Sequence, residues 1–200
     1  MRIALITIPR SGSSFYSRVL AKQHKVKHVG ELFVVNNNPS RELLGKRFKH
    51  PKTIDESLRI WSHGDCCAKI FTRDFIHMPK AKLSLLEYEE LVYGSADKIY
   101  YLYRKNTLEH LKSIITADET SYWAPYKEHK EVYVETSEQM ISDQLKRIQI
   151  DTQRLDELQT RFPGETVYYE NFASKEWKYK YTPKFFCDGE ELPHNLGLNL

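Results

Sequence analysis

The sequence predicts an α/β fold, with helices packed on both faces of a central, mostly parallel sheet. Short continuous apolar runs, such as Ile3 to Ile8, are typical of strands that are buried on both faces. Segments of helical periodicity separate these runs, and this alternation implies crossover connections between parallel strands. The 200 residues include 40% hydrophobic and 28% charged residues, which is an ordinary globular composition. We therefore expect residues 1–200 to form a single domain.

The first strand and the first helix meet at an abrupt boundary. The apolar run from Ile3 to Ile8 ends in Pro9-Arg10-Ser11-Gly12-Ser13-Ser14, and a helix is expected from Ser13 because Phe15, Val19 and Leu20 share one stripe. The hydroxyls between Ser11 and Ser14 can cap that helix. The next stretch, "KHVGELFVV", is expected to be extended, and a polar basic loop follows to about Lys52.

The middle of the chain continues the alternation. Strands are expected at Cys67 to Thr72 and at Asp97 to Tyr103, with a helix between them from Ser84 to about Val92. A further helix is expected from Thr107 to Ala117. The aromatic span from Ser121 to Val134 is interrupted by Pro125, so we expect a surface loop or a lid there.

One long helix dominates the last third of the chain. It is expected from about Ser137 to Phe162, and its apolar face consists of Ile141, Leu145, Ile148, Leu155, Leu158 and Phe162. A coiled coil is less consistent with this stripe, which has few heptads and ends at Pro163-Gly164. A last strand is expected at Glu165 to Glu170, followed by an irregular tail.

Composition and charge exclude several classes of protein. The formal charge of +3 is too small to indicate a nucleic-acid binder, and no segment approaches the roughly 20 apolar residues of a membrane helix. The basic clusters at 41–52 and 175–184 suit either a solvated face or an anion site. Cys66, Cys67 and Cys187 form no CxxC pair, and the amino terminus lacks the pattern of a signal peptide. We therefore expect a cytoplasmic protein with no nucleic-acid or membrane partner.

The loop from Pro9 to Ser14 has the features of an anion site. A strand-to-helix turn directs backbone N–H groups and the positive end of the helix dipole at one point. Gly12 allows close approach of the backbone, the serines add hydroxyls, and Arg10 adds a permanent charge. The loop lacks the Gly-x-x-x-x-Gly-Lys-Ser/Thr spacing of a nucleotide-hydrolysing P-loop. The alternative is a well-capped helix with no ligand.

A second group of polar residues follows the strand at Asp97 to Tyr103. Ligands of parallel α/β sheets bind beyond the carboxyl ends of the strands, where Arg104 and Glu170 are expected as well as the first loop. A guanidinium at Arg104 and a hydroxyl at Ser113 could therefore bind a second phosphate beside that loop. The alternative for Arg104 is an ion pair with a local carboxylate such as Glu109.

Together these two stretches resemble the donor site of sulfotransferases that use 3′-phosphoadenosine 5′-phosphosulfate. Residues Pro9 to Ser14 look like that family's 5′-phosphosulfate loop, a Lys/Arg-Ser-Gly-Ser/Thr-Ser/Thr pattern at a strand–helix junction. Arg104 and Ser113 look like its 3′-phosphate pair. Their spacing, Asn106 between them and the segment "VGELF" are similar to the bacterial carbohydrate branch, of the trehalose and nodulation-factor type. The resemblance implies a P-loop-like, three-layer α/β/α fold.

The resemblance also implies an activity and a role for each residue of the motifs. The activity is transfer of a sulfuryl group to a hydroxyl or amine, with no metal. Arg10 would face the bridging and sulfuryl oxygens, and the backbone of Ser11, Gly12, Ser13 and Ser14 would hold the 5′-phosphate. Arg104 and Ser113 would bind the 3′-phosphate. Glu31 would accept the proton of the acceptor, a small molecule, a carbohydrate or a peptide.

The chain departs from the family pattern near the expected general base. The bacterial branch often has a second Glu after its Gly-Glu-Pro segment, and Val34 stands there, while Leu32 replaces the proline. His28, His63 and Asp65 therefore remain as rival bases to Glu31. Lys69, in the strand at Cys67 to Thr72, could face the donor or be an ordinary polar residue.

Other regions offer weaker expectations. Tyr122, Trp123 and Tyr126 could form an acceptor wall or pack on their own domain, and Trp177, Lys178 and Lys180 could replace the family's carboxyl-terminal lid. Two other functions stay open: a protein that keeps the fold and has lost catalysis, and a P-loop-type kinase. The missing Gly-Lys-Ser/Thr argues against the kinase.

Overall fold

The computed structural model describes residues 1–34, 53–75, 83–120, 130–173 and 181–198. These residues form the following elements in chain order: β1 (Arg2–Thr7), α1 (Ser13–Gln23), β2 (Lys27–Glu31), α2 (Ile54–Ser62), β3 (Cys66–Phe71), α3 (Leu85–Tyr93), β4 (Lys98–Tyr103), α4 (Thr107–Thr120), β5 (Lys130–Glu135), α5 (Glu138–Arg161), β6 (Glu165–Tyr168), α6 (Tyr169–Phe172), β7 (Tyr181–Cys187) and β8 (Glu190–Glu191). None of the helices in this part of the chain is long and apolar enough to cross a membrane.

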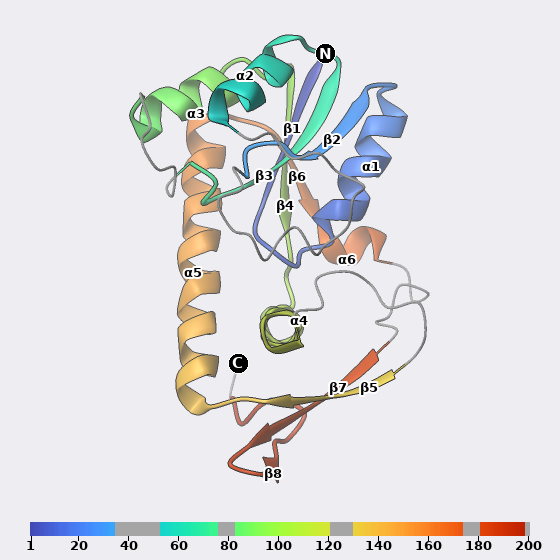
Figure 1. Cartoon of the computed structure of the whole chain (residues 1–200), viewed down its shortest axis with the longest axis vertical. Helices are drawn as coiled ribbons and strands as arrows, with labels where there is room; N and C mark the ends of the chain where they lie inside the picture. The colour runs from blue at the N-terminus through green and yellow to red at the C-terminus, as the bar shows by residue number, and fades with distance from the viewer. Residues whose placement is uncertain (35–52, 76–82, 121–129, 174–180, 199–200) are drawn as a thin grey trace.

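The main sheet has five parallel strands in the order β2-β3-β1-β4-β6. Its central strand, β1, pairs with β3 on one side and with β4 on the other, and the run from Ile3 to Ile6 is completely buried. This arrangement confirms the predicted α/β fold with a parallel sheet. All five carboxyl ends lie at one edge of the sheet, the lower edge in Figure 1.

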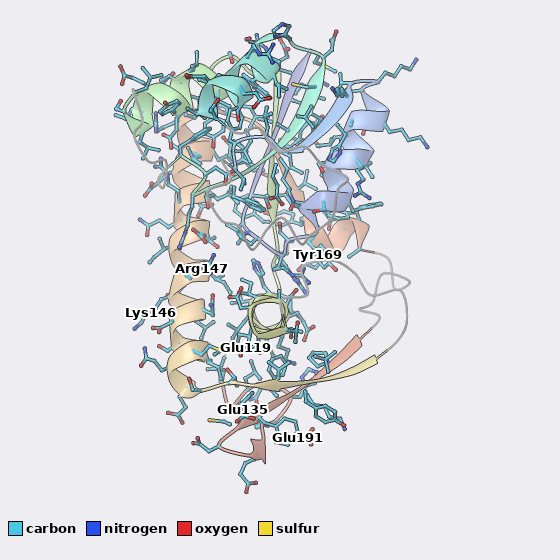
Figure 2. The ribbon with its side chains drawn as sticks, in the orientation of Figure 1. Glu119, Glu135, Lys146, Arg147, Tyr169 and Glu191 are labelled. Atoms are coloured by element: carbon cyan, nitrogen blue, oxygen red, sulfur yellow. The ribbon has the colours of Figure 1, made fainter. Side chains whose placement is uncertain are left out.

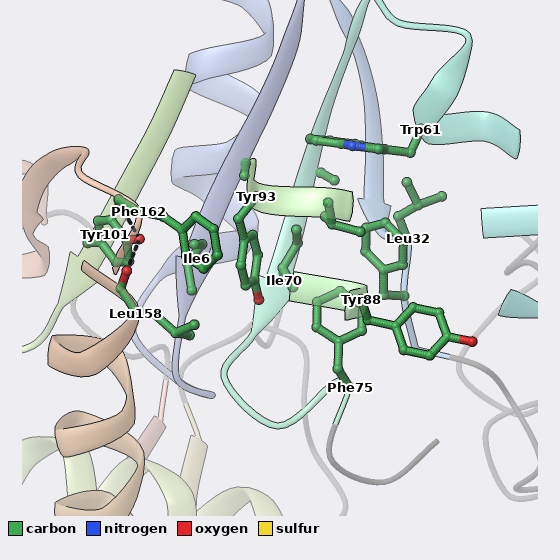
Figure 3. Packing of buried hydrophobic residues seen from close by; sticks show 14 of the residues in the cluster. Ile6, Leu32, Trp61, Ile70, Phe75, Tyr88, Tyr93, Tyr101, Leu158 and Phe162 are labelled. Atoms are coloured by element: carbon green, nitrogen blue, oxygen red, sulfur yellow. Dashed lines mark hydrogen bonds between the residues drawn. The ribbon is translucent and has the colours of Figure 1, made fainter. Parts of the chain in front are cut away.

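Helices cover both faces of this sheet (Figure 1). On one face α1 packs through Leu20 and Ala21 against Ile3, Leu5 and Cys67. On the other face α2, α3 and α5 bring Trp61, Tyr88 and Leu158 onto Ile6 and Ile70, as Figure 3 shows. Alternate residues of β1 therefore belong to different cores, which is the pattern of a strand buried on both faces.

A buried tyrosine joins the long helix to the sheet. The hydroxyl of Tyr101, on β4, donates to the carbonyl of Phe162 at 2.7 Å and lies 3.0 Å from that of Leu158 (Figure 3). Both carbonyls lie at the carboxyl end of α5, and that of Leu158 also accepts the N–H of Phe162. Because the tyrosine is completely buried, these bonds satisfy a hydroxyl that would otherwise be costly to desolvate.

A second, smaller sheet lies beyond the carboxyl edge, in the order β5-β7-β8. Val132 and Val134 of β5 and Phe185 of β7 pack with α4 and α5 in a separate hydrophobic cluster. Two expectations are wrong here: the end of the Ser121–Val134 span is a strand and not a loop, and the tail forms β7 and β8. The buried valines alternate with exposed Tyr133, as expected of a strand with one covered face.

Two smaller differences concern α2 and the end of β6. No element was expected between residues 53 and 65, yet α2 forms there, with the side chain of Thr53 accepting the N–H of Glu56 as its amino-terminal cap. The strand expected to reach Glu170 ends at Tyr168, and Glu170 lies in the short helix α6.

Candidate functional site

The loop between β1 and α1 begins at the carboxyl edge of the sheet. Arg10 has a φ of 64° and Gly12 a φ of 80°, so two residues of this short turn adopt the left-handed conformation. Gly12 is the amino-terminal cap of α1 and has no side chain with which to cap it. A turn of this kind, at a helix amino terminus, presents backbone N–H groups to an anion.

Two buried hydroxyls, those of Ser11 and Thr7, fix the loop to the end of the sheet. The Oγ of Ser11 donates to the carbonyl of Ile8 at 2.8 Å and lies 2.5 Å from the Oγ1 of Thr7. Thr7 in turn reaches the carbonyl of Leu102 on β4 at 3.1 Å. The side chain of Ser11 therefore serves the loop's own structure, while Ser14 is exposed at the start of α1.

The structure brings the second predicted stretch to the first. The Nε of Arg10 donates to the Oγ of Ser113 on α4 at 3.0 Å, across 103 residues of sequence. The Nη1 of Arg104, at the end of β4, donates to the carbonyl of Arg10 at 3.0 Å, across 94 residues. Glu109, the alternative partner of Arg104, pairs instead with Lys112 at 3.3 Å. Three of the predicted site residues thus meet at the loop.

Two further strands contribute Lys69 and Glu31. The Nζ of Lys69, on β3, lies 2.9 Å from the Oγ of Ser14 and 2.7 Å from the Oε1 of Glu31, at the end of β2. The Lys69 side chain is 7% exposed, so this ammonium is nearly withdrawn from water and compensated by one carboxylate. The predicted base Glu31 therefore does lie near the loop, as the ion-pair partner of a lysine.

Of the three rival bases, His28 lies near the loop, whereas His63 and Asp65 lie at the opposite edge of the sheet. His28 on β2 lies near the loop; its Nε2 is 2.9 Å from the Oγ of Ser17, and burial together with Arg18 and Lys69 lowers its pKa. His63 and Asp65 lie just before β3, at the amino edge of the sheet. Asp65 accepts from the terminal amine of Met1 at 2.6 Å there. The strand length thus separates His63 and Asp65 from the loop.

The helix α6 covers the loop from the β6 side. The guanidinium of Arg104 lies over the ring of Tyr169, 4.6 Å from its centroid, and Figure 2 labels Tyr169 beside α6. Glu170 accepts the backbone N–H of Asn106 at 3.0 Å. Burial opposes the charged form of Glu170, but the backbone hydrogen bonds from Asn106 and its neighbours and the charge of Arg104 hold its pKa below the ordinary value.

His110 is a residue of the site that sequence reasoning missed. It lies on α4, is 1% exposed, and its Nε2 is 2.7 Å from the carbonyl of Pro9. Burial lowers its pKa to about 4; the bond to Pro9 opposes this shift, while Arg104 and Arg10 add to it. Its position three residues before Ser113 places both on one face of α4, which is the signal that could have indicated it.

A charged cluster between α4 and α5 was also missed. Asp118, near the end of α4, accepts from the Nε2 of Gln144 at 3.0 Å and lies 4.0 Å from the Nη1 of Arg147, both on α5. Figure 2 labels Arg147 on the side of α5 toward α4 and Lys146 on the opposite side. Burial raises the pKa of Asp118, against the opposing charges of Arg147 and Arg10.

Several expectations fall on residues outside the described ranges. These are the acceptor wall of Tyr122, Trp123 and Tyr126 and the lid residues Trp177, Lys178 and Lys180.

Comparisons with known proteins give little beyond the fold. No protein-family model matches the chain, and no curated protein matches it. Among solved structures it is similar to a gluconokinase from Sinorhizobium meliloti 1021, with a TM-score of 0.43, 10% sequence identity, and coverage of 84% of this chain and 82% of that one.

Proposed function

We propose that this chain is a sulfotransferase. It takes a sulfuryl group from 3′-phosphoadenosine 5′-phosphosulfate and transfers it to a hydroxyl or amine of a small molecule or carbohydrate. The observation that carries the proposal is the convergence of Arg10, Arg104 and Ser113 on one anion-binding turn. The two stretches were singled out separately in the sequence, and a donor with two phosphate positions needs both of them together.

The residues of the loop fit a phosphate group. An added Cβ at Gly12 would lie 2.6 Å from the ring of Tyr169, so the packing of this ring on the turn requires glycine, and the positive φ of Gly12 keeps the turn that presents the N–H groups. The backbone of Ser11 to Ser14 would hold the 5′-phosphate by its N–H groups. Arg10 would neutralise charge that builds up on the oxygens of the transferred group, which is the main requirement of such a displacement.

The residues around α4 fit a second phosphate. The bond from Arg104 to the Arg10 carbonyl holds its guanidinium, a planar group suited to phosphate oxygens, beside the loop. Ser113 is 4% exposed and its hydroxyl lies against Arg10, so both phosphate positions would share one connected set of donors. We assign Arg104 and Ser113 to the 3′-phosphate.

Lys69 distinguishes this proposal from a kinase. In P-loop NTPases a Ser or Thr that follows the loop lysine holds Mg²⁺, together with an Asp at a neighbouring strand end. Here the hydroxyl of Ser14 contacts the ammonium of Lys69, and the neighbouring carboxylate of Glu31 pairs with the same ammonium. A fixed cation beside the loop suits a donor that needs no divalent metal, and we assign Lys69 to the donor's phosphosulfate group.

Glu31 is the proposed general base, and its position also supports a second candidate function. A carboxylate at a strand end beside the loop can accept a proton from the acceptor. The same carboxylate forms an ion pair with Lys69 at 2.7 Å, an arrangement equally suited to a protein that binds the nucleotide without turning it over. Incubation with labelled donor and a panel of hydroxyl and amine acceptors separates these two functions.

A ligand titration tests the proposed function. Thermal unfolding is followed while adenosine 3′,5′-bisphosphate, the product nucleotide, or ATP with Mg²⁺ is added. A ligand that binds only the native state raises the melting temperature with its concentration. The bisphosphate should raise it and ATP should not, and Arg104→Ala should remove most of the rise. No response to the bisphosphate would refute the proposal, and a response to ATP alone would favour the kinase.

A further inference from the structure

His110 and Arg104 hold two successive carbonyls of the anion loop. Nε2 of His110 is 2.7 Å from the carbonyl oxygen of Pro9, and the Nη1 of Arg104 is 3.0 Å from that of Arg10. A carbonyl oxygen can only accept, so the imidazole carries its hydrogen on Nε2. Arg104 reaches the loop from the end of β4, and His110 reaches it from α4.

Fixing a carbonyl also fixes the N–H group that shares its peptide plane. The peptide bonds of the described residues are all trans, and in a trans peptide the C=O and the N–H point in opposite directions. The bonds to Pro9 and Arg10 therefore turn the N–H of Arg10 away from His110 and the N–H of Ser11 away from Arg104. Successive N–H groups on one side of a left-handed turn form a concavity that attracts anions.

The other nitrogen of His110 supports this assignment of the hydrogen. Nδ1 is buried and has no hydrogen-bond partner among the described residues. A protonated imidazole would place a second N–H there, in a site that is 1% exposed. The charged groups that act on this ring are Arg10 from the loop, Arg104 from the end of β4 and Glu170 from α6. Two cations against one carboxylate favour the neutral ring.

We propose that His110 is a positioning residue of the donor site, which orients the anion loop through the carbonyl of Pro9. It acts by donating the hydrogen on its Nε2, and the buried Nδ1 favours the neutral ring. His110 contacts no part of the donor itself, and this inference rests on the proposed function because the anion is the donor's 5′-phosphosulfate group. Loss of the bond should loosen the loop's N–H groups and weaken anion binding in a protein that still folds.

Two substitutions separate positioning from packing. The side-chain amide of glutamine reaches about as far as Nε2, so His110→Gln keeps a donor for Pro9, whereas His110→Met has a similar length and no donor. The matched control is His24→Met. His24 follows α1 at its carboxyl end, far from the loop, and its Nε2 lies 3.0 Å from the hydroxyl of Tyr100. Each protein is titrated calorimetrically with adenosine 3′,5′-bisphosphate, well below its melting temperature.

The expected result is a loss of about tenfold in affinity for His110→Met, the scale of one hydrogen bond. His110→Gln and His24→Met should stay within about threefold of the unaltered protein, a difference below one hydrogen bond. Equal affinities for all four proteins would overturn the inference and leave the proposed function standing. A purely structural role would lower the melting temperature of His110→Met without changing its affinity, which would also overturn it.

A readout without ligand keeps the two proposals distinguishable. Failure of the unaltered protein to bind the bisphosphate would refute the proposed function. Nitrogen NMR of the imidazole then tests His110 alone: a hydrogen on Nε2 and a bare Nδ1 at pH 7 are expected. A neutral ring with its hydrogen on Nδ1 has no hydrogen to donate to the carbonyl of Pro9, and it would overturn the inference whatever the ligand.

Discussion

Replacing Gly12 by alanine tests the close packing of α6 on the anion loop. A Cβ at this position would lie 2.6 Å from Cδ2 and 2.8 Å from Cε2 of Tyr169. Carbon atoms in van der Waals contact are about 3.5–4.0 Å apart, so the ring must move. Tyr169 also carries the guanidinium of Arg104, 4.6 Å from its centroid, so moving the ring disturbs the proposed 3′-phosphate ligand.

The expected loss of stability has two parts. Gly12 has a φ of +80°, and an alanine in this left-handed region costs about 1–2 kcal/mol. Overpacking against Tyr169 adds about 1–3 kcal/mol. Gly64 provides the matched control, because it has a φ of +75° but nothing within 4 Å of an added Cβ. Gly64→Ala should therefore lose only the first part, about 1–2 kcal/mol.

Urea unfolding and calorimetric titration with adenosine 3′,5′-bisphosphate measure both effects. Gly12→Ala should be less stable than Gly64→Ala and should bind the bisphosphate at least about tenfold more weakly, the scale of one lost hydrogen bond or more. Gly64→Ala should bind it as the unaltered protein does. Equal stability losses in the two variants, with affinity unchanged in both, would refute the packing of Tyr169 on the loop.

The remaining predictions concern one pH effect and two ion pairs. The pKa of His110 falls from its ordinary 6.5 to about 4 on folding, so the unfolded chain binds more protons than the folded one between these pH values. The free energy of unfolding should therefore fall by up to about 1.4 kcal/mol per pH unit as the pH drops through this window. In urea unfolding, His110→Met should lose less stability per pH unit over the same range. Lys69→Met should weaken bisphosphate binding about tenfold or more in calorimetry, since it removes a charged donor beside Ser14; an unchanged affinity would exclude Lys69 from the site. Glu89→Gln should destabilise by about 1.5–3 kcal/mol in urea, because the buried Glu89 carboxylate pairs with Arg154 and Arg161, and it should leave the bisphosphate affinity unchanged.

The main sheet could be predicted from the sequence because its strands carry the evidence locally. The run from Ile3 to Ile8 is apolar at every position except Thr7, a pattern typical of a strand covered on both faces, and all six residues are buried. The apolar period of the long helix likewise matches its buried residues Ile141, Ile148, Leu155 and Leu158. In these two segments the length of the apolar run and the spacing of the apolar residues are consistent with few structures other than a buried strand and an amphipathic helix.

The smaller sheet could not be predicted in the same way. Lys130–Glu135 alternates valines with polar residues and Tyr133, but its partner strand begins at Tyr181, so the pairing is invisible in either segment alone. The short β6 ends where Tyr169 and Phe172 turn to cover the loop, because their rings pack on Gly12, Phe15 and Tyr16. Tertiary packing overrides the local β propensity of "VYYENF" at that point.

Motif and topology together indicated most of the candidate site. Arg10, Arg104 and Ser113 could be named because each follows a strand end or faces it from a helix. His110 was not named, since a buried histidine on a helix is common; its spacing of three from Ser113 places it on the right face of α4, but its role depends on the distance to the Pro9 carbonyl. Lys69 was one candidate to face the donor, and its ion pair with Glu31 depends on the pairing of β2 with β3.

The most direct test of the proposed function is the contribution of the 3′-phosphate to binding. Adenosine 3′,5′-bisphosphate and adenosine 5′-monophosphate differ only in that group, and calorimetric titration with each, in a buffer containing EDTA, measures it. The proposed function predicts that the bisphosphate binds at least about tenfold more tightly, and that Arg104→Ala reduces this ratio toward one. Equal affinities for the two nucleotides, or no binding of either without a divalent metal, would contradict it.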